Sequence, residues 1–479
     1  MSDALLSTSV NVVEEGTIEV DVHAAIDLMV KDERYYAGFG PGQWLVAVPY
    51  YVVLRPIIGL LPHAEKTWAN NNYAYKRPKA LPLRVIYLQI AMVWFFLGPL
   101  TGFFFAKLYQ VLRRTALTPS YALAGTLAAS TGTLIATYSC VYSRQWLATL
   151  LIALVALRHL PGWREAPGWG RRSRYVYGLL LGYAVAVDYI AVFGVALVAL
   201  FHLLCERDKR DALPLLGGVA TIAVLMAFYH LWLVGHPLKT PYQFRVWHDH
   251  NLGFSYKGQW YNFGQVTQNG IVGMGLLPSW AALWGLTFGT FKGLFFFSPI
   301  LLFGLAGLVS TLRDPVKKPV AYLCLAQFLA YFWAIASTNG EIFWSSWPIF
   351  FGPRYLIYGV PFLTFGLAWV RLERTWWRAL FLAALVASCA VHVLGLMFHE
   401  RNLVASLEAP SVQAPIPHLA GWLVKEGPRV PLLDQNFFTA PGWVQILVFL
   451  GYLGALTACV VLVRSRERSD PLATRAAGA

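Results

Sequence analysis

Charged residues are scarce in this sequence. Only 13% of the 479 residues are Asp, Glu, Lys or Arg, whereas 57% are hydrophobic. Soluble globular domains are about one quarter charged, so this composition excludes a soluble globule. The apolar residues gather in long runs, and we therefore predict an all-α, polytopic membrane protein with about 10–12 transmembrane or re-entrant helices.

Cysteine is also rare. The five cysteines lie in or beside apolar runs without metal-ligand spacing, which argues against a disulfide framework. Acidic residues are too few to balance the basic ones, and the net charge is +14. Because the basic residues occupy short loops between apolar runs, the positive-inside rule explains this excess better than nucleic acid does. We expect no nucleic-acid partner.

The N-terminal stretch has few basic residues. Residues 1–42 contain eight acidic residues and only two basic ones, which makes them a poor cytoplasmic anchor. We therefore expect them on the outer side. The apolar run 44–61 is broken by two prolines and Arg55, and we predict that it lies in the outer interface. Together these stretches form a first domain over 1–83, an outer-face loop with interfacial helices.

The later apolar runs predict the spans, near 84–106, 119–139, 145–158, 176–204, 215–234, 294–311, 319–337, 353–371, 378–398 and 442–463. The basic clusters fall on one side only if the run 176–204 crosses twice or re-enters, which places Asp188 at an outer turn. The long loops then all lie outside, so we expect function at the outer face. The two further predicted domains are a transmembrane core over 84–372 with outer loop 235–293, and C-terminal helices over 373–479 with outer loop 399–441 and a cytoplasmic tail.

One arginine stands at the mouth of an apolar run, in the stretch WSSWPIFFGPRYLIYGVP that covers Trp344–Pro361. An ionisable group at the mouth of a span is costly, which favours a functional role for Arg354. The alternative is an interfacial arginine that snorkels to the headgroups beside an aromatic belt.

Four phrases, in order along the chain, resemble the motif series of bacterial GT-C glycosyltransferases, integral membrane proteins of the protein-mannosyltransferase-like kind. They are EEGTIEVD with DERYYAGFGPGQWLVAVPYY, then GLLLGYAVAVDYIAVF, GLLPSWAALWGLTFGTFKGLFFFSPILL and TNGEIFWSSWPIFFGPRYLIYGVPFL. The resemblance covers most of residues 1–372, and the order of the motifs is more specific than any one motif. The family's first transmembrane helix has no counterpart in this sequence.

The resemblance implies a multi-pass enzyme of the bacterial inner membrane. Such an enzyme transfers a sugar, with inversion, from a polyprenyl-phosphate donor to a glycan, lipid or protein acceptor on the outer face, among membrane lipids. The chemistry needs a carboxylate to activate the acceptor hydroxyl, and cationic groups or a metal to stabilise the departing phosphate. No Gly-rich nucleotide loop is present, which favours a lipid-linked donor. A divalent cation, Mg²⁺ or Mn²⁺, stays open, and no metal ligand is assigned.

The resemblance places the catalytic base among the acids of the first outer loop. The expected order is Asp3, then Asp21, then Asp27, because the family's aspartate closely follows its first helix. The alternative for each of them is a solvated loop carboxylate without a role. Asp32 belongs to the phrase DERYY and reads as a turn residue.

For the donor phosphate the first choice is Arg354, whose planar guanidinium suits a phosphate. The second choices are Arg144, in the predicted outer turn YSRQW, and Lys292, in the phrase FKGLF. The family usually carries arginine where Lys292 stands, so the charge is kept and the bidentate geometry is lost. The alternative for both is snorkelling to the interface.

Acceptor or sugar binding is assigned to Asp188 and to outer-loop residues, which are Tyr242, His248, Trp260, Trp344 and Trp347. Asp188 lies in an apolar run, so it must be paired, solvated or protonated. It either pairs structurally with Arg144 or takes part in acceptor binding or metal coordination. The His-Asp-His triplet at 248–250 lacks a second ligand pair at helical spacing, so we prefer an aromatic, hydrogen-bonding acceptor platform to a metal site.

Two rival functions fit the same sequence. A transporter or flippase of lipid-linked glycans would need charged groups at mid-membrane on several helices, whereas the charges here lie at the ends of the runs, with Asp188 as the exception. A polymerase or ligase of surface glycans would share the outer site and differ only in its acceptor.

Overall fold

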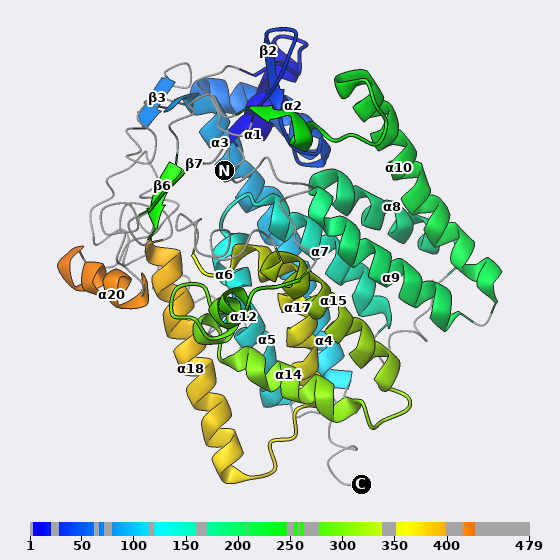
Figure 1. Ribbon diagram of the computed structural model, residues 1–479, viewed down its shortest axis with the longest axis vertical. Helices are drawn as coiled ribbons and strands as arrows, with labels where there is room; N and C mark the ends of the chain where they lie inside the picture. The colour runs from blue at the N-terminus through cyan, green and yellow to red at the C-terminus, as the bar shows by residue number, and fades with distance from the viewer. Residues whose placement is uncertain are drawn as a thin grey trace.

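The computed structural model describes residues 3–20, 28–61, 67–70, 79–114, 119–159, 170–206, 208–246, 253–256, 259–262, 277–337, 351–398 and 415–426. Within these ranges the chain is mostly helical, as the sequence predicts. Five helices are long and apolar enough to cross a membrane: Gly42–Leu60, Leu83–Arg114, Lys209–Val234, Lys318–Ala336 and Thr375–Leu396. The chain is therefore a helical, membrane-embedded protein (Figure 1).

The helices follow one another in three groups. The first contains α1 (Asp3–Glu14), α2 (Gly42–Leu60), α3 (Leu83–Met92), the π-helical η1 (Val93–Leu97), α4 (Gly98–Arg114), α5 (Pro119–Thr131), α6 (Leu134–Ser139), α7 (Arg144–Ala156) and η2 (Leu157–His159). The second contains α8 (Arg171–Val187), η3 (Tyr189–Ala191), α9 (Val192–Cys205), η4 (Lys209–Ala212), α10 (Leu213–Val234) and η5 (Pro241–Phe244). The third contains α12 (Trp280–Thr287), α13 (Leu294–Phe297), α14 (Ile300–Thr311), α15 (Lys318–Ala336), η7 (Arg354–Tyr358), α17 (Val360–Phe365), η8 (Gly366–Trp369), α18 (Thr375–Phe398) and α20 (Pro415–Glu426).

Several apolar runs that read as single spans are divided in the structure. The run 119–139 breaks at Thr133, whose side chain accepts a hydrogen bond from the Ile135 amide and so starts a new helix. Pro299 separates α13 from α14, because a proline offers no amide hydrogen to continue the first helix. The run 353–371 consists of three short pieces, η7, α17 and η8.

The long run 176–204 is two helices that meet at Asp188. Asp188 has an extended backbone, ends α8 and caps η3, where its carboxylate accepts the Ile190 amide at 3.4 Å. This division agrees with the prediction that the run 176–204 crosses twice or re-enters. Whether α8 and α9 both cross the membrane stays a prediction.

The all-α prediction missed three small sheets. Strands β1 (Leu28–Lys31) and β2 (Arg34–Ala37) form a hairpin, and β1 also pairs with β5 (Arg245–Val246) in the order β2-β1-β5. The other two sheets pair β3 (Thr67–Asn70) with β4 (Lys79–Pro82), and β6 (Gly253–Tyr256) with β7 (Gln259–Asn262).

The hairpin turn confirms one detail of the sequence reading. Asp32 and Glu33 both have positive φ, 51° and 62°, as a two-residue hairpin loop requires. Asp32 is thus a turn residue. Through the pairing of β1 with β5, the β2-β1-β5 sheet joins the first loop to the beginning of the loop that follows α10.

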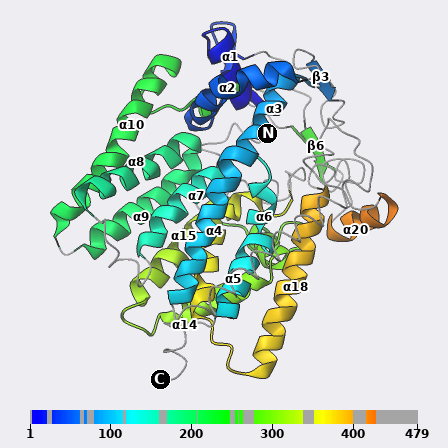
Figure 2. The same cartoon turned by 180° about the vertical axis from the view of Figure 1, so that it is seen from behind.

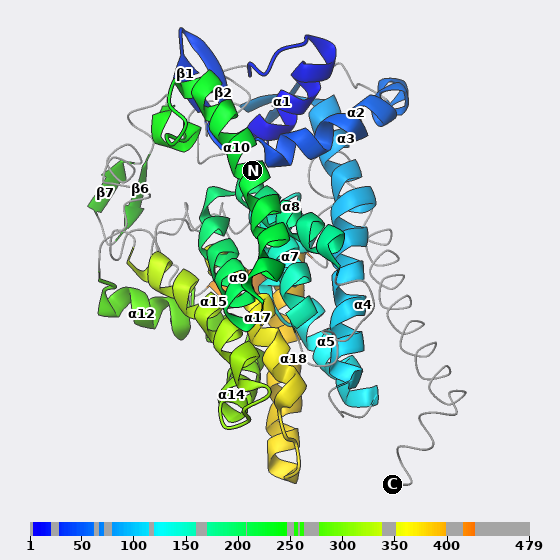
Figure 3. The same cartoon turned by 90° about the vertical axis from the view of Figure 1, so that its right-hand side faces the viewer.

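Helix α2 lies across the end of α3 and α4 instead of running alongside them (Figure 3). Several of its apolar residues face outward, among them Val53, which is 72% exposed, and Leu60, which is 86% exposed. The length and composition of α2 would also suit a span. Its crosswise orientation agrees with the predicted interfacial position.

The centre of the molecule is α7. Nearly all residues of α7 are buried, including Trp146, whose indole donates to the Thr101 hydroxyl of α4 at 2.9 Å. A helix that is buried all round belongs to the core. Helices α4 and α5 lie side by side, in front of α7 in the view of Figure 2. The polar N-terminus of α7 is therefore held inside the protein.

Candidate functional site

The N-terminus of α7 brings three polar side chains into the core. Ser143 caps the helix by accepting the Trp146 amide at 3.5 Å, and Arg144 and Gln145 follow in the first turn. The positive end of a helix dipole disfavours a cation there, so the buried Arg144 needs a compensating charge.

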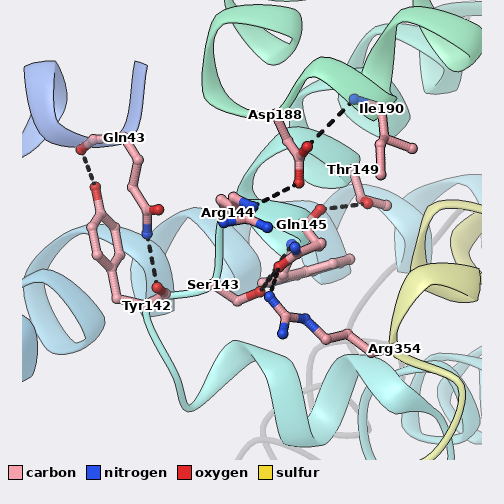
Figure 4. Close-up of polar contacts among 10 residues, drawn as sticks. Gln43, Tyr142, Ser143, Arg144, Gln145, Thr149, Asp188, Ile190 and Arg354 are labelled. Carbon is pink, nitrogen blue, oxygen red and sulfur yellow. Dashed lines mark hydrogen bonds and ion pairs between the residues drawn. The ribbon is translucent and has the colours of Figure 1, made fainter. Parts of the chain in front are cut away.

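Asp188 supplies that charge. Arg144 Nε lies 3.1 Å from Asp188 Oδ2, and both side chains are buried (Figure 4). The ring of Phe39 covers the guanidinium, with its centroid 3.4 Å from the Arg144 Cζ. Of the two readings that the sequence left open for Asp188, the structure shows the pairing with Arg144. Acceptor binding and metal coordination by Asp188 stay predictions.

The first loop is hydrogen-bonded to the residue that precedes the Ser143 cap of α7. The Gln43 amide donates to the Tyr142 carbonyl at 2.8 Å, and the Tyr142 hydroxyl donates to the Gln43 carbonyl at 2.9 Å. A Cβ on Gly40 would lie 2.2 Å from the Ala186 carbonyl oxygen, so only glycine permits this close approach to the end of α8. The segment Phe39–Gln43 thus covers the ion pair.

Arg354 reaches the site from the other side of α7. Its Nη2 donates to Gln145 Oε1 at 2.9 Å, and the Ser143 hydroxyl donates to the same oxygen at 3.1 Å (Figure 4). The preceding Gly352 has φ +63°, a left-handed conformation that turns the chain into η7. Just before it, the Phe351 carbonyl accepts the Tyr138 hydroxyl at 3.0 Å. The backbone on both sides of this turn is therefore fixed.

Lys292 lies in the turn between α12 and α13 and is only 4% exposed. This turn is outside the five long apolar helices. Burial, and then the nearby positive charge of Arg354, lower the pKa of Lys292 to about 7. Lys292 and Arg354 are both buried, and they are near enough for the charge of Arg354 to lower the pKa of Lys292.

Three of the predicted site residues are thus gathered around the N-terminus of α7, namely Arg144, Asp188 and Arg354, and a fourth, Lys292, lies near enough to Arg354 for their charges to interact. A fifth, Tyr242, lies beside them, because its ring packs on Phe39 at a centroid distance of 5.7 Å. Asp21, Asp27, His248, Trp344 and Trp347 lie outside the described residues. Asp3 begins α1 and Trp260 lies in β7, and their side chains are also outside the described part.

Sequence reasoning missed the uncharged residues of the site, which are Phe39, Gln43, Tyr142, Ser143 and Gln145. One signal was present, because the phrase YSRQW places a serine directly before an apolar run and so marks a helix N-cap. The partner of each residue comes from a distant segment, and no spacing in the sequence shows that.

The site as described is suited to an anion. Among the described residues, no three His, Cys, Asp or Glu side chains come close enough to hold a metal ion. The carboxylate of the site, Asp188, is bonded to Arg144, whereas Lys292 and Arg354 add positive charge. The Gln145 Nε2 is buried without a hydrogen-bond partner among the described residues. These groups could hold a phosphate.

Comparisons of the chain with models of protein families, with curated proteins and with solved structures find no match.

Proposed function

We propose that this chain is a GT-C type glycosyltransferase that moves a sugar from a polyprenyl-phosphate donor to an acceptor on the outer face of the bacterial inner membrane. One observation carries the proposal. All four phrases of the resemblance contribute to one buried place: Phe39–Gln43, Asp188, Lys292 and Arg354 come from the four phrases in turn, around Arg144. Segments far apart in sequence that converge on cationic groups are expected of a binding site.

The donor phosphate would lie against Lys292 and Arg354. A guanidinium and an ammonium stabilise the lipid phosphate as it departs, and a buried site strengthens this effect. Arg144 is bonded to Asp188, so we assign it to shaping the site. Thus Arg354 stays the first choice for the phosphate, and Lys292 becomes the second.

The base remains a proposal among Asp3, Asp21 and Asp27. Support comes from the first loop, since Phe39 and Gln43 are docked on the site and β1 begins directly after Asp27. A first-loop carboxylate would deprotonate the acceptor hydroxyl for attack at the anomeric carbon. The bond from that carbon to the phosphate oxygen breaks, and the sugar is transferred with inversion.

Reconstituted vesicles test the function. Sugar transfer from a polyprenyl-phosphate sugar would be measured for variants in which each of Asp3, Asp21 and Asp27 is changed to Asn, and Arg354 to Gln. We expect Arg354→Gln and one Asp variant to lose at least about 100-fold in rate, as a lost transition-state contact does. The matched control is Arg313→Gln, an exposed arginine that follows α14. Unchanged turnover in all four variants would exclude the site.

The transport rival is tested with the same vesicles. A flippase would move the labelled lipid-linked sugar from one leaflet to the other without breaking the bond to phosphate. Movement without release of polyprenyl phosphate would contradict the enzyme proposal.

A further inference from the structure

We propose that the side-chain amide of Gln145 binds the ligand's phosphate directly, with Nε2 as a hydrogen-bond donor to one phosphate oxygen. This inference rests on the proposed phosphate site and adds an uncharged donor to its cations. It is carried by the fixed orientation of the amide, by the burial of its nitrogen, and by the place of Gln145 in the first turn of α7.

The orientation of the Gln145 amide is fixed by two donors that meet at its oxygen. Oε1 accepts a bond from Arg354 Nη2 at 2.9 Å and one from the Ser143 hydroxyl at 3.1 Å. A guanidinium can only donate, so a flipped amide would place its own N–H groups against those of Arg354. The amide is therefore held with Oε1 toward Arg354, and Nε2 is its other end (Figure 4).

Nε2 is the end of the amide without a partner. The Gln145 side chain is fully buried, and Nε2 forms no hydrogen bond with any described residue. A buried donor that has lost water and gained no acceptor destabilises a protein, so such groups usually bind an ordered water or a ligand. Gln145 thus uses its oxygen within the protein and has two N–H hydrogens for another acceptor.

The surroundings of Gln145 favour an anionic acceptor. The residue lies in the first turn of α7, where the positive end of the helix dipole attracts negative charge. Arg354 brings a full positive charge to the same amide, and its hydrogen bonds to a phosphate would be charge-assisted. A sugar hydroxyl could also accept from Nε2, but it would gain less from the two positive charges. We therefore assign the acceptor to a phosphate oxygen.

Titration calorimetry with a synthetic isoprenyl methyl phosphodiester tests the contact in the purified full-length protein. Gln145→Met keeps the length of the side chain and removes both the donor and the acceptor. We expect it to weaken binding at least about tenfold, because a hydrogen bond to a charged group contributes roughly this much. The matched control is Gln327→Met, at an equally buried glutamine whose Nε2 donates to the Gly194 carbonyl at 2.7 Å. The control should lower stability and leave the affinity unchanged.

A double-mutant cycle separates a direct contact from an effect through Arg354. Affinities are compared for Arg354→Met, for Gln145→Met and for the variant with both substitutions. If Gln145 only holds Arg354 in place, its loss has no effect once the Arg354 side chain is gone. If Nε2 binds the phosphate, Gln145→Met should weaken binding at least about fivefold in the Arg354→Met protein as well.

Nuclear magnetic resonance of the unchanged protein gives a second readout, which serves also if Gln145→Met fails to fold. With glutamine isotopically labelled in the side-chain amide, the Nε2 hydrogens of Gln145 should shift downfield when the phosphodiester is added, whereas those of Gln327 should not. The Gln145 signal is identified by its absence from Gln145→Glu, a variant that keeps an oxygen acceptor for Arg354 and Ser143.

The outcomes distinguish this inference from the phosphate site itself. Affinity that is unchanged in Gln145→Met, or that is lost only through Arg354, overturns the inference and leaves the phosphate site intact. A Gln145 amide signal that stays in place on binding has the same consequence and assigns Nε2 to a trapped water. Absence of binding in the unchanged protein overturns the phosphate site and this inference with it.

Discussion

Arg144 and Asp188 show that a buried charge needs a partner of opposite charge. Neither residue tolerates the core alone, because a charge removed from water costs several kcal/mol (order of magnitude) unless it is paired. Their ion pair fixes the end of α7 to the break between α8 and α9. The ring of Phe39 then shields the pair from water. The three residues therefore hold the shape of the site.

Breaking this pair should destabilise the protein strongly. Asp188→Asn leaves the Arg144 charge buried without its carboxylate, and we expect a loss of about 3–5 kcal/mol in the free energy of unfolding. Unfolding in detergent, followed by tryptophan fluorescence, measures the loss. The control is Glu19→Gln, which breaks the exposed pair with Arg34 and should cost far less stability.

The double variant Arg144→Met/Asp188→Leu sharpens the test, because it removes both charges and should recover much of the stability. If Asp188→Asn were no more destabilising than Glu19→Gln, the structural role of the pair would be wrong.

The sequence could predict the charged residues of the site for a physical reason. Each charge in an apolar run must be compensated, so Asp188 and Arg354 stand out on cost alone. Pairing of Asp188 with Arg144 was one of two readings, and only the structure distinguishes them. Gln145 could not be predicted, because a neutral amide in the first turn of a helix is ordinary until Arg354 is seen to donate to it.

At the scale of elements, the breaks between helices determine how the apolar runs are divided. Asp188 divides a run that hydropathy alone reads as one overlong span, and Pro299 and Thr133 divide two others. The breaks at Asp188 and Thr133 lie at residues that cap helices, and the break at Pro299 lies at a residue that interrupts one. The sequence contained these signals, but hydropathy averages over them. The β2-β1-β5 sheet could not be foreseen because β5 has only two residues.

The left-handed turn at Gly352 gives a prediction at this scale. Gly352→Ala places a Cβ in a conformation with φ +63° and 2.6 Å from Leu134 Cδ2, so either the Leu134 side chain or the turn that carries Arg354 must shift. We expect a loss of about 1–2 kcal/mol in stability from the backbone conformation. Binding of a synthetic isoprenyl methyl phosphodiester, which resembles the phosphate end of the proposed donor, should weaken at least about tenfold, equal to about 1.4 kcal/mol.

Gly235 offers a matched control for that variant. It also has positive φ, +75°, but a Cβ there meets nothing within 4 Å. Gly235→Ala should cost similar stability and leave phosphodiester binding unchanged. If both variants lost stability and neither lost affinity, the turn at Gly352 would not position Arg354 for a phosphate.

At the scale of the molecule, the orientation of α2 decides how the first loop meets the membrane. Helix α2 lies across the end of the bundle and exposes an apolar stripe, while Trp44 and Tyr51 are buried on the opposite side (Figure 3). An amphipathic helix in this position places its apolar face among the lipid chains just below the headgroups. The docked loop Phe39–Gln43 would then enter the site at the level of the interface.

Depth measurements along α2 test this arrangement. Single cysteines would replace Leu45, Val53 and Leu60 in a background whose native cysteines are changed to alanine, and a fluorescent label on each would be quenched by lipids brominated at known depths. Residues 45 and 60 are separated by about 22 Å along the helix axis. If α2 lies in the interface, all three labels should report the same shallow depth.

Labels at Leu213, Leu225 and Trp232 of α10 provide the contrast, because these exposed residues belong to a helix long enough to cross. Their depths should pass from one headgroup layer through the centre to the other. A similar progression along α2 would make it a span. Residues 1–41 and the loop that follows α2 would then lie on opposite sides of the membrane, and the interfacial position of α2 would be wrong.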